Sequence, residues 1–414
     1  MSSLRNKKSK TTIVLFILLV IAASLFSFVA RYDGTPSESN GSEKLTANLG
    51  IRSRQMFETE IPEAVIETMD PKMVDFVVAG FQKCGTTYLQ NKIFYPSERL
   101  FIPHHETHFL QNDKYAEFIG EFENVTKAAN GDGKEVLAGY KSPFVLGHHR
   151  SLRNLETLFP DIRMIITLRH PISAFQSLYN YKLRQSPEPL PPAEEFVGLC
   201  RELCSEETDM EQMAQSCLNN AHWCTGEMGY HKYLSRLGLT PMNTSEELDL
   251  LGHHGMSIHD FSGSRKGVMS SVRGVKGKQH VDEARLFLIE IGQFDHRMNQ
   301  TMADDVRSDL ETFLGLDPGD LPRAPNQHGM KRPKIDYKYP PGYEEYVLDI
   351  CLDQYKPMRK ILLETSRKAS KWIMEYLLHP SNRHRVIVSN IDIFQQMLEG
   401  WKIDPCLTKD EALE

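Results

Sequence analysis

Short apolar runs alternate with amphipathic stretches through the middle of the chain. The apolar runs are long enough for buried strands at 73–79, 136–141, 163–169 and 285–291. Segments that follow the strands are expected to be helical at 86–94, 148–159, 172–184, 229–237 and 304–314. Strands that alternate with helices are typical of a parallel sheet with helices on both faces. The pattern therefore predicts an α/β fold of three layers with a central parallel sheet.

The segments outside this alternation differ in composition. Residues 31–71 are rich in Ser, Glu, Asn, Gly and Thr, which predicts a flexible stem before a domain over 72–378. Residues 186–225 interrupt the rhythm with prolines and cysteines and are interpreted as an insertion. A long helix over about 343–376 is expected to close the domain. Residues 379–414 then remain as a C-terminal extension.

The first thirty residues combine a basic flank with an uncharged run. Residues 1–10 carry four Lys or Arg side chains, and residues 11–30 carry no charge. About 20 apolar residues in a helix cross about 30 Å of hydrocarbon, and basic flanks favour the cytoplasmic side. We therefore expect a cytoplasmic tail, a transmembrane signal-anchor and a type II topology. A cleaved signal peptide is the alternative, although its apolar core usually has about 7 to 15 residues.

Charge and glycosylation motifs narrow the class of partner. The formal net charge of −7 gives no reason to expect nucleic acid, so a site for a polyanion must be a local patch. Asn-x-Ser/Thr sequons, which agree with a glycosylating compartment, occur at Asn40, Asn124, Asn243 and Asn299.

Cysteine spacing favours disulfides over a metal. Four of the seven cysteines lie close together in the chain: Cys200, Cys204, Cys217 and Cys224. Their spacing is not the C-x2-C repeat of a zinc ribbon, so two disulfides are favoured over a metal site, with three connectivities open. Cys351 and Cys406 can form another pair, which leaves Cys84 free.

A glycine-bounded turn joins the first apolar run to a helix start. Residues 80–85 place Gln82, Lys83 and Cys84 between Gly80 and Gly85, and Thr86 and Thr87 follow. Backbone N–H groups in such a turn and the helix dipole favour a phosphate there. The loop of nucleotide triphosphatases has its lysine directly after the second glycine, whereas Lys83 precedes Gly85, which argues against an ATPase or kinase. A turn that binds nothing is the alternative.

A second motif pairs Arg169, at the end of the 163–169 strand, with Ser177 on the following helix. A guanidinium and a hydroxyl at these positions can bind one phosphate, and arginine can contact two oxygens at once. The alternative for Arg169 is a surface salt bridge.

The turn resembles a known family. Lys83-Cys84-Gly85-Thr86-Thr87 after a buried strand is similar to the 5′-phosphosulfate loop of Golgi carbohydrate sulfotransferases, including the heparan sulfate and N-acetylgalactosamine 4-sulfate 6-O types. The resemblance implies a P-loop-like fold and 3′-phosphoadenosine 5′-phosphosulfate as co-substrate. It also implies that Arg169 and Ser177 hold the 3′-phosphate, although the family often has a further arginine where this chain has Ser173 and Ala174.

The same resemblance assigns the remaining candidate residues. The segment 104–109 resembles the family's K-E-x-H-F-F segment, in which Glu106 matches the catalytic base and His105 replaces a lysine. Lys141, before Ser142 and Pro143, matches a lysine near the transferred group. Lys331 and Arg332 match a basic loop that covers the cofactor. An exposed loop glutamate and a solvated charge run are the alternatives for Glu106 and the basic loop.

Together these features predict sulfuryl transfer to a carbohydrate hydroxyl in the Golgi lumen without a metal. The acceptor is expected to be an acidic polysaccharide, which the basic stretch 265–278 could bind. A membrane-tethered glycan-binding protein that has lost catalysis, a tyrosylprotein sulfotransferase and, less favoured, a phosphotransferase are the alternatives.

Overall fold

The computed structural model describes residues 61–104, 106, 108–129, 136–197, 228–237, 239, 284–294, 300–323 and 341–407. The predicted cytoplasmic tail, the 11–30 span, the four-cysteine cluster, and Lys331 and Arg332 lie outside these ranges. No helix within them is long and apolar enough to cross a membrane.

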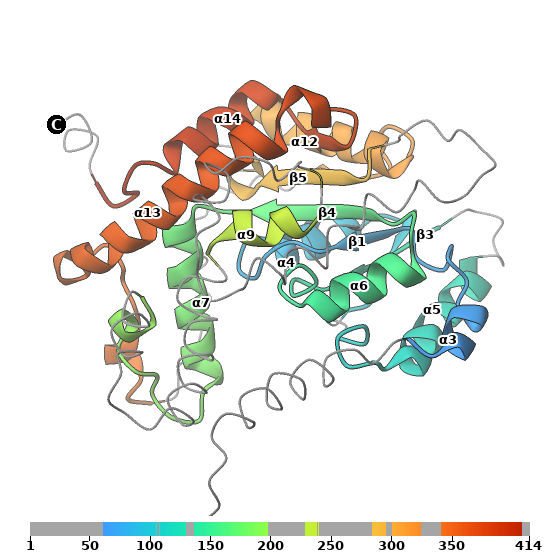
Figure 1. Cartoon of the computed structure of the whole chain (residues 1–414), viewed down its shortest axis with the longest axis horizontal. Helices are drawn as coiled ribbons and strands as arrows, with labels where there is room; N and C mark the ends of the chain where they lie inside the picture. The colour runs from blue at the N-terminus through green and yellow to red at the C-terminus, as the bar shows by residue number, and fades with distance from the viewer. Residues whose placement is uncertain are drawn as a thin grey trace, which may run out of the picture. The chain divides into compact units, whose positions relative to one another are not determined.

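Six parallel strands form one sheet in the described part of the chain (Figure 1). They are β1 (Phe76–Val78), β2 (Leu100–Phe101), β3 (Leu137–Lys141), β4 (Arg163–Leu168), β5 (Leu286–Glu290) and β6 (Val386–Val388). Their order is β2-β3-β1-β4-β5-β6, and every neighbouring pair is parallel. The predicted central parallel sheet is therefore confirmed.

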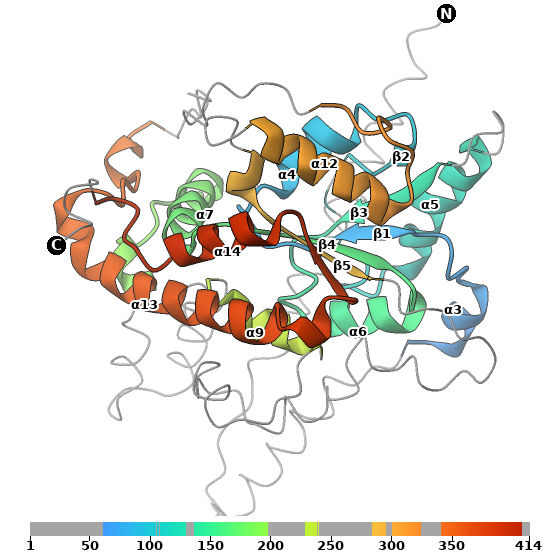
Figure 2. The ribbon, with the colours of Figure 1, turned by 90° about the horizontal axis from the view of Figure 1, so that it is seen from above.

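Helices cover both faces of the sheet (Figure 2). They are α3 (Glu63–Thr68), α4 (Thr86–Tyr88), α5 (Tyr115–Ala129), α6 (His149–Leu158), α7 (Pro171–Gln185), α9 (Tyr230–Leu234), α12 (Gln300–Leu314), α13 (Lys356–Trp372) and α14 (Ile391–Gly400). Successive strand residues point to opposite faces, so Ile166 packs in the core with α7 and α13, whereas Ile165 packs in the core with α12. The structure thus has the predicted three layers.

The C-terminal third differs from the prediction. The long helix expected over 343–376 begins only at Lys356, with Pro357 in its first turn, and a π-helical turn (Ile373–Leu377) continues it. Two 3₁₀ turns, Glu344–Tyr346 and Asp353–Tyr355, precede it. Residues 379–414 were expected to be an extension, yet β6 pairs with β5 and α14 packs against the core. The sheet therefore continues past the predicted boundary at 378.

The start of the domain also lies earlier than predicted. Helix α3 falls inside the stem expected over 31–71. Ile61 and Met69, on either side of α3, are buried in the same core as α5 and α6. The packed part of the chain therefore includes residues before the predicted boundary at 72.

The sheet topology places one strand end at a switch point. After β1 the chain forms β2 and β3 on one side of β1, and it then crosses to β4 on the other side of β1. Ligands of open parallel sheets bind outside the carboxyl ends of the strands, where the strand order reverses in this way. The turn after β1 occupies that position.

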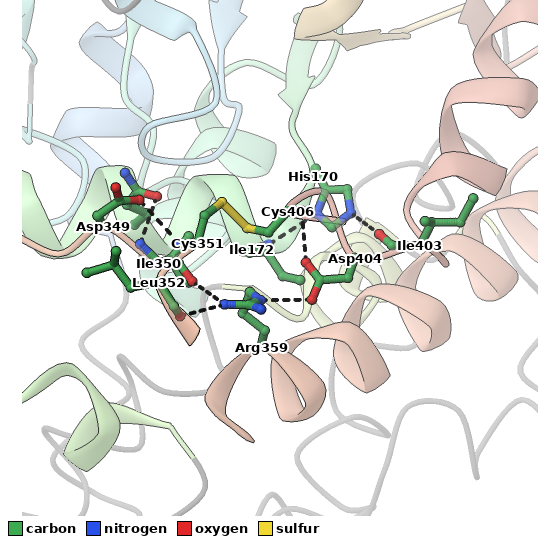
Figure 3. Close-up of a disulfide and its surroundings, with 11 residues drawn as sticks. His170, Ile172, Asp349, Ile350, Cys351, Leu352, Arg359, Ile403, Asp404 and Cys406 are labelled. Carbon is green, nitrogen blue, oxygen red and sulfur yellow. Dashed lines mark hydrogen bonds and ion pairs between the residues drawn. A yellow bond between two sulfur atoms is a disulfide. The ribbon is translucent and has the colours of Figure 1, made fainter. Parts of the chain in front are cut away.

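A disulfide ties the segment before α13 to the segment after α14 (Figure 3). Cys351 and Cys406 are bonded, as the sequence suggested, and the buried Cys84 forms no disulfide in the described part of the chain. Beside the bond, Arg359 donates to Asp404 Oδ2 at 2.8 Å and to the carbonyl of Ile350 at 2.7 Å. The disulfide and this ion pair hold the C-terminal segment against α13.

The double substitution Cys351→Ser and Cys406→Ser is expected to lower the free energy of unfolding. The bond closes a loop with a sequence separation of 55, so its loss costs about 4 kcal/mol of chain entropy. Urea denaturation of the two proteins measures the difference. Reductant should lower the midpoint of the native protein more than that of the variant, because the expected disulfides of the four-cysteine cluster are present in both proteins. A variant as stable as the native protein would contradict the expectation.

Candidate functional site

The turn between β1 and α4 is shaped by two close approaches. A Cβ on Gly80 would lie 2.4 Å from the backbone nitrogen of Thr167, and one on Gly85 would lie 2.2 Å from Ile291 Cδ1. Gly85 also has φ +96°, which disfavours any other residue. A side chain therefore does not fit at either glycine of the predicted motif, because the turn is packed against the ends of β4 and β5.

The helix start after the turn presents donors. Gly85 is the N-terminal cap of α4, which continues as a π-helix over Leu89–Phe94. The first N–H groups of a helix have no partner within it and favour an anion. Thr87 is exposed at this end, whereas Thr86 is buried. The turn thus has the geometry expected of an anion site.

Lys83 lies in the turn with φ 59° and its ammonium nitrogen 4.0 Å from the centre of the Tyr181 ring on α7. Burial lowers the pKa of Lys83 to about 8. The pKa of Lys83 is lowered further by the positive charges of Arg184, Arg169 and Lys141. The carboxylate of Glu106 has the opposite effect. An anion bound among these cations would reduce their mutual repulsion, so the residues fit a phosphate or sulfate group.

Glu106 and Lys141 are joined by an ion pair. Lys141 Nζ lies 3.0 Å from Glu106 Oε1 and donates to Thr87 Oγ1 at 3.2 Å. The Lys141 side chain is 5% exposed, whereas that of Glu106 is 34% exposed. Lys141 is the last residue of β3, so it connects the segment after β2 with the turn after β1. Three segments that the sequence singled out separately therefore meet at one place, with the carboxylate on the solvent side.

Arg169 links the second motif to the turn. It follows β4, and its guanidinium donates to the carbonyl of Lys83 at 3.3 Å. Ser177 lies half-buried on α7. No hydrogen bond joins Ser177 to Arg169 among the described residues.

Other predicted residues contribute differently. The sulfur of Cys84 lies 3.3 Å from the hydroxyl of Tyr230, and its N–H donates to the carbonyl of Phe81. Through these two contacts Cys84 shapes the turn, and its expected contact with the cofactor stays a prediction. Gln82 lies half-buried in the same turn.

Sequence reasoning missed two side chains of α7. Tyr181 lies under the ammonium of Lys83, and Arg184 lies 5.7 Å from the centre of the same ring. A signal existed, because positions four and seven after Ser177 fall on one helix face with it. Among the described residues, no group of three or more metal-ligating side chains occurs.

The chain resembles known proteins across this site. Residues 74–232 match the family model of the sulfotransferase domain. The matched region contains Lys83, Glu106, Lys141 and Arg169. No curated protein matches the chain. A sulfotransferase structure from Alicyclobacillus acidocaldarius is 15% identical, with 73% of this chain and 96% of that chain covered and a TM-score of 0.39.

Proposed function

We propose that this chain transfers a sulfuryl group from 3′-phosphoadenosine 5′-phosphosulfate to a hydroxyl of a carbohydrate. The observation that carries the proposal is the Glu106–Lys141–Thr87 chain of contacts, which joins a partly exposed carboxylate to the anion-binding turn. A base for a hydroxyl and a site for the donor's phosphate have to be adjacent for such a transfer. The sulfotransferase domain over 74–232 supports the same reaction class.

The surroundings of Lys83 suit the donor's 5′ end. The donor supplies the sulfuryl group and the 5′-phosphate that leaves when the group is transferred. Lys83 and the N–H groups at the start of α4 would bind that phosphate and stabilise the negative charge that develops on its oxygen. Arg169 and Ser177 would hold the 3′-phosphate, with Arg169 oriented by its hydrogen bond to Lys83.

Glu106 would accept the proton of the acceptor hydroxyl as the hydroxyl oxygen bonds to sulfur. The ion pair with Lys141 would hold the Glu106 carboxylate in place beside the anion-binding turn. Lys141 would also stabilise negative charge on the transferred group, because it lies between Glu106 and Thr87. Positioning and electrostatic stabilisation would account for the catalysis, and each role falls on a side chain or backbone N–H group of this chain.

The carbohydrate acceptor and the Golgi location rest on sequence features. The sequons, the uncharged 11–30 run and the resemblance to Golgi carbohydrate sulfotransferases support a lumenal, type II enzyme. Five Lys and Arg residues in 265–278 support an acidic polysaccharide. These residues and the 11–30 run lie outside the described part.

Transfer assays with the purified full chain test the proposal. Labelled phosphosulfate donor is offered with acidic and neutral glycans and with acidic tyrosine peptides. Label on a glycan supports the proposal. Label only on the peptides would favour a tyrosylprotein sulfotransferase, and glycan binding with no transfer to any acceptor would favour a binding protein that has lost catalysis.

A further inference from the structure

We infer that Glu290 is a positioning residue for Arg169 and, through it, for the 3′-phosphate of the donor. The inference rests on the proposed function, because it concerns the same donor site. Glu290 is the last residue of β5 and lies opposite Leu168 in the sheet, directly beside the start of the Arg169 motif. Neither the sulfuryl transfer nor the residues assigned to it above involve this carboxyl group.

Three segments of the chain converge on the buried Glu290 carboxylate. It accepts the N–H of Gly292 at 2.5 Å, the backbone N–H of His170 and the side-chain N–H of Trp401. The residue is 6% exposed. A buried carboxylate is stable only when hydrogen bonds and charge compensate its burial, and here the ends of β4 and β5 and the C-terminal segment provide them. The carboxylate thus connects the end of its own strand with two segments that are distant in the sequence, the one after β4 and the C-terminal one.

Electrostatics ties the same carboxylate to Arg169. Burial raises the pKa of Glu290 to about 7, while the N–H groups of Gly292 and Trp401 and the positive charge of Arg169 lower it. Arg169 in turn donates to the carbonyl of Lys83 in the phosphate turn. Loss of the carboxylate would therefore remove a negative charge that acts on Arg169 and the acceptor of the N–H of the next residue, His170. Phosphate binding by a guanidinium depends on its geometry.

The residue after Glu290 supports the other motif. Ile291 lies so close to Gly85 that a Cβ on the glycine would be 2.2 Å from its Cδ1. The end of β5 is therefore packed against the phosphate turn and bonded to the Arg169 motif at the same time. This arrangement accounts for a polar, buried side chain at the end of a strand whose other four residues are apolar.

The C-terminal segment holds the cluster from the other side. Trp401 is buried, and its ring lies 5.7 Å from that of Tyr230, whose hydroxyl contacts Cys84 in the phosphate turn. His170 Nε2 lies 3.1 Å from the carbonyl oxygen of Ile403. Figure 3 shows this contact beside Asp404 and the disulfide. The disulfide-bonded C-terminal segment thus holds Trp401, whose side-chain N–H donates to Glu290.

The substitution Glu290→Gln tests the inference, because the amide keeps the shape but offers a donor where three donors converge. The readout is the ratio of dissociation constants of adenosine 5′-phosphate and adenosine 3′,5′-bisphosphate, measured by calorimetry on the full chain. This ratio isolates the 3′-phosphate, which a general loss of stability does not do. We expect the preference for the bisphosphate to fall by about tenfold, which corresponds to about 1.4 kcal/mol.

Glu311→Gln is the matched control. Glu311 is 3% exposed, accepts N–H groups of Gly319 and Leu321 at 2.9 Å, and pairs with Arg307, but it lies on α12 away from both motifs. This variant should lose stability and keep the native ratio. A native ratio in Glu290→Gln would overturn the inference alone. A native protein with no preference for the bisphosphate would overturn the proposed function instead.

Trp401→Phe provides a second variant if Glu290→Gln does not fold. It keeps an aromatic ring in the core and removes the N–H that Glu290 accepts. The bisphosphate preference should fall about threefold, since one of the carboxylate's hydrogen bonds is lost. Trp372→Phe makes the same change at another buried tryptophan and should leave the ratio unchanged. Equal ratios in the two tryptophan variants would contradict the inference.

Discussion

Glu106→Gln is expected to lower kcat for sulfuryl transfer by about 10² to 10⁴-fold, the range for loss of a general base. The amide cannot accept the hydroxyl proton, although it has almost the same shape. The dissociation constant of the nucleotide should change little, because the carboxylate contacts Lys141 and not the backbone of the phosphate turn. Single-turnover transfer of labelled sulfate and nucleotide calorimetry measure the two effects separately.

The control has to separate the loss of a base from the loss of an ion pair, since the substitution also removes the partner of Lys141. Glu106→Asp keeps the charge and should recover part of kcat, whereas Glu106→Gln should not. Glu117→Gln removes an exposed carboxylate that pairs with Lys114 at 3.1 Å and should have native activity. If Glu106→Gln retained more than a tenth of native kcat, another group would have to accept the proton.

Four strands of the central sheet, β1, β3, β4 and β5, could be predicted closely from local pattern, whereas β2, with two residues, was missed. β4 was expected at 163–169 and is Arg163–Leu168, because five consecutive buried residues leave an unmistakable apolar run. β6 has only three residues, too few for any periodicity to be recognised. Helix α5 was also missed, although Phe118 and Phe122 are spaced for one helix face and both are buried in the core.

The error over 343–376 has a nonlocal cause. The side chain of Asn180 on α7 donates to the carbonyl of Leu348 at 2.9 Å and accepts its N–H at 2.8 Å. These two bonds satisfy the backbone of Leu348 outside a helix, and their partner comes from a distant part of the sequence. No pattern within 343–355 contains this information, so helical spacing alone was misleading there.

The candidate site was predictable as a set of residues but not as a set of contacts. The motifs identified Lys83, Glu106, Lys141 and Arg169, since each follows a strand or occurs in a recognisable segment. The ion pair between Glu106 and Lys141 depends on β2 and β3 being neighbours, which only the strand order establishes. The burial of Glu290 beneath Trp401 depends in the same way on the C-terminal segment folding back over β5.

Lys83→Met is expected to reduce both donor binding and turnover, with kcat lowered by about 10² to 10³-fold. Methionine has a similar length and no charge, so the charge that offsets the departing phosphate is lost while the packing over Tyr181 is largely kept. Lys83→Arg retains a charge and should be less affected than Lys83→Met. Nucleotide calorimetry and single-turnover transfer with the three proteins measure these differences.

The pKa of Lys83 gives this prediction a second, independent readout. Burial lowers that pKa to about 8, so the free enzyme loses the positive charge as the pH rises through 8. A bound anion favours the charged form, so the affinity for adenosine 3′,5′-bisphosphate should fall by up to about tenfold per pH unit above that value. Lys83→Met should bind weakly throughout and lack this decline, and Lys83→Arg should lack it because guanidinium stays charged.

Burial also lowers the pKa of Lys232 to about 8, but Lys232 is present in all three proteins and cannot produce a difference between them. A decline of equal size in Lys83→Met would show that some group other than Lys83 carries the titrating charge.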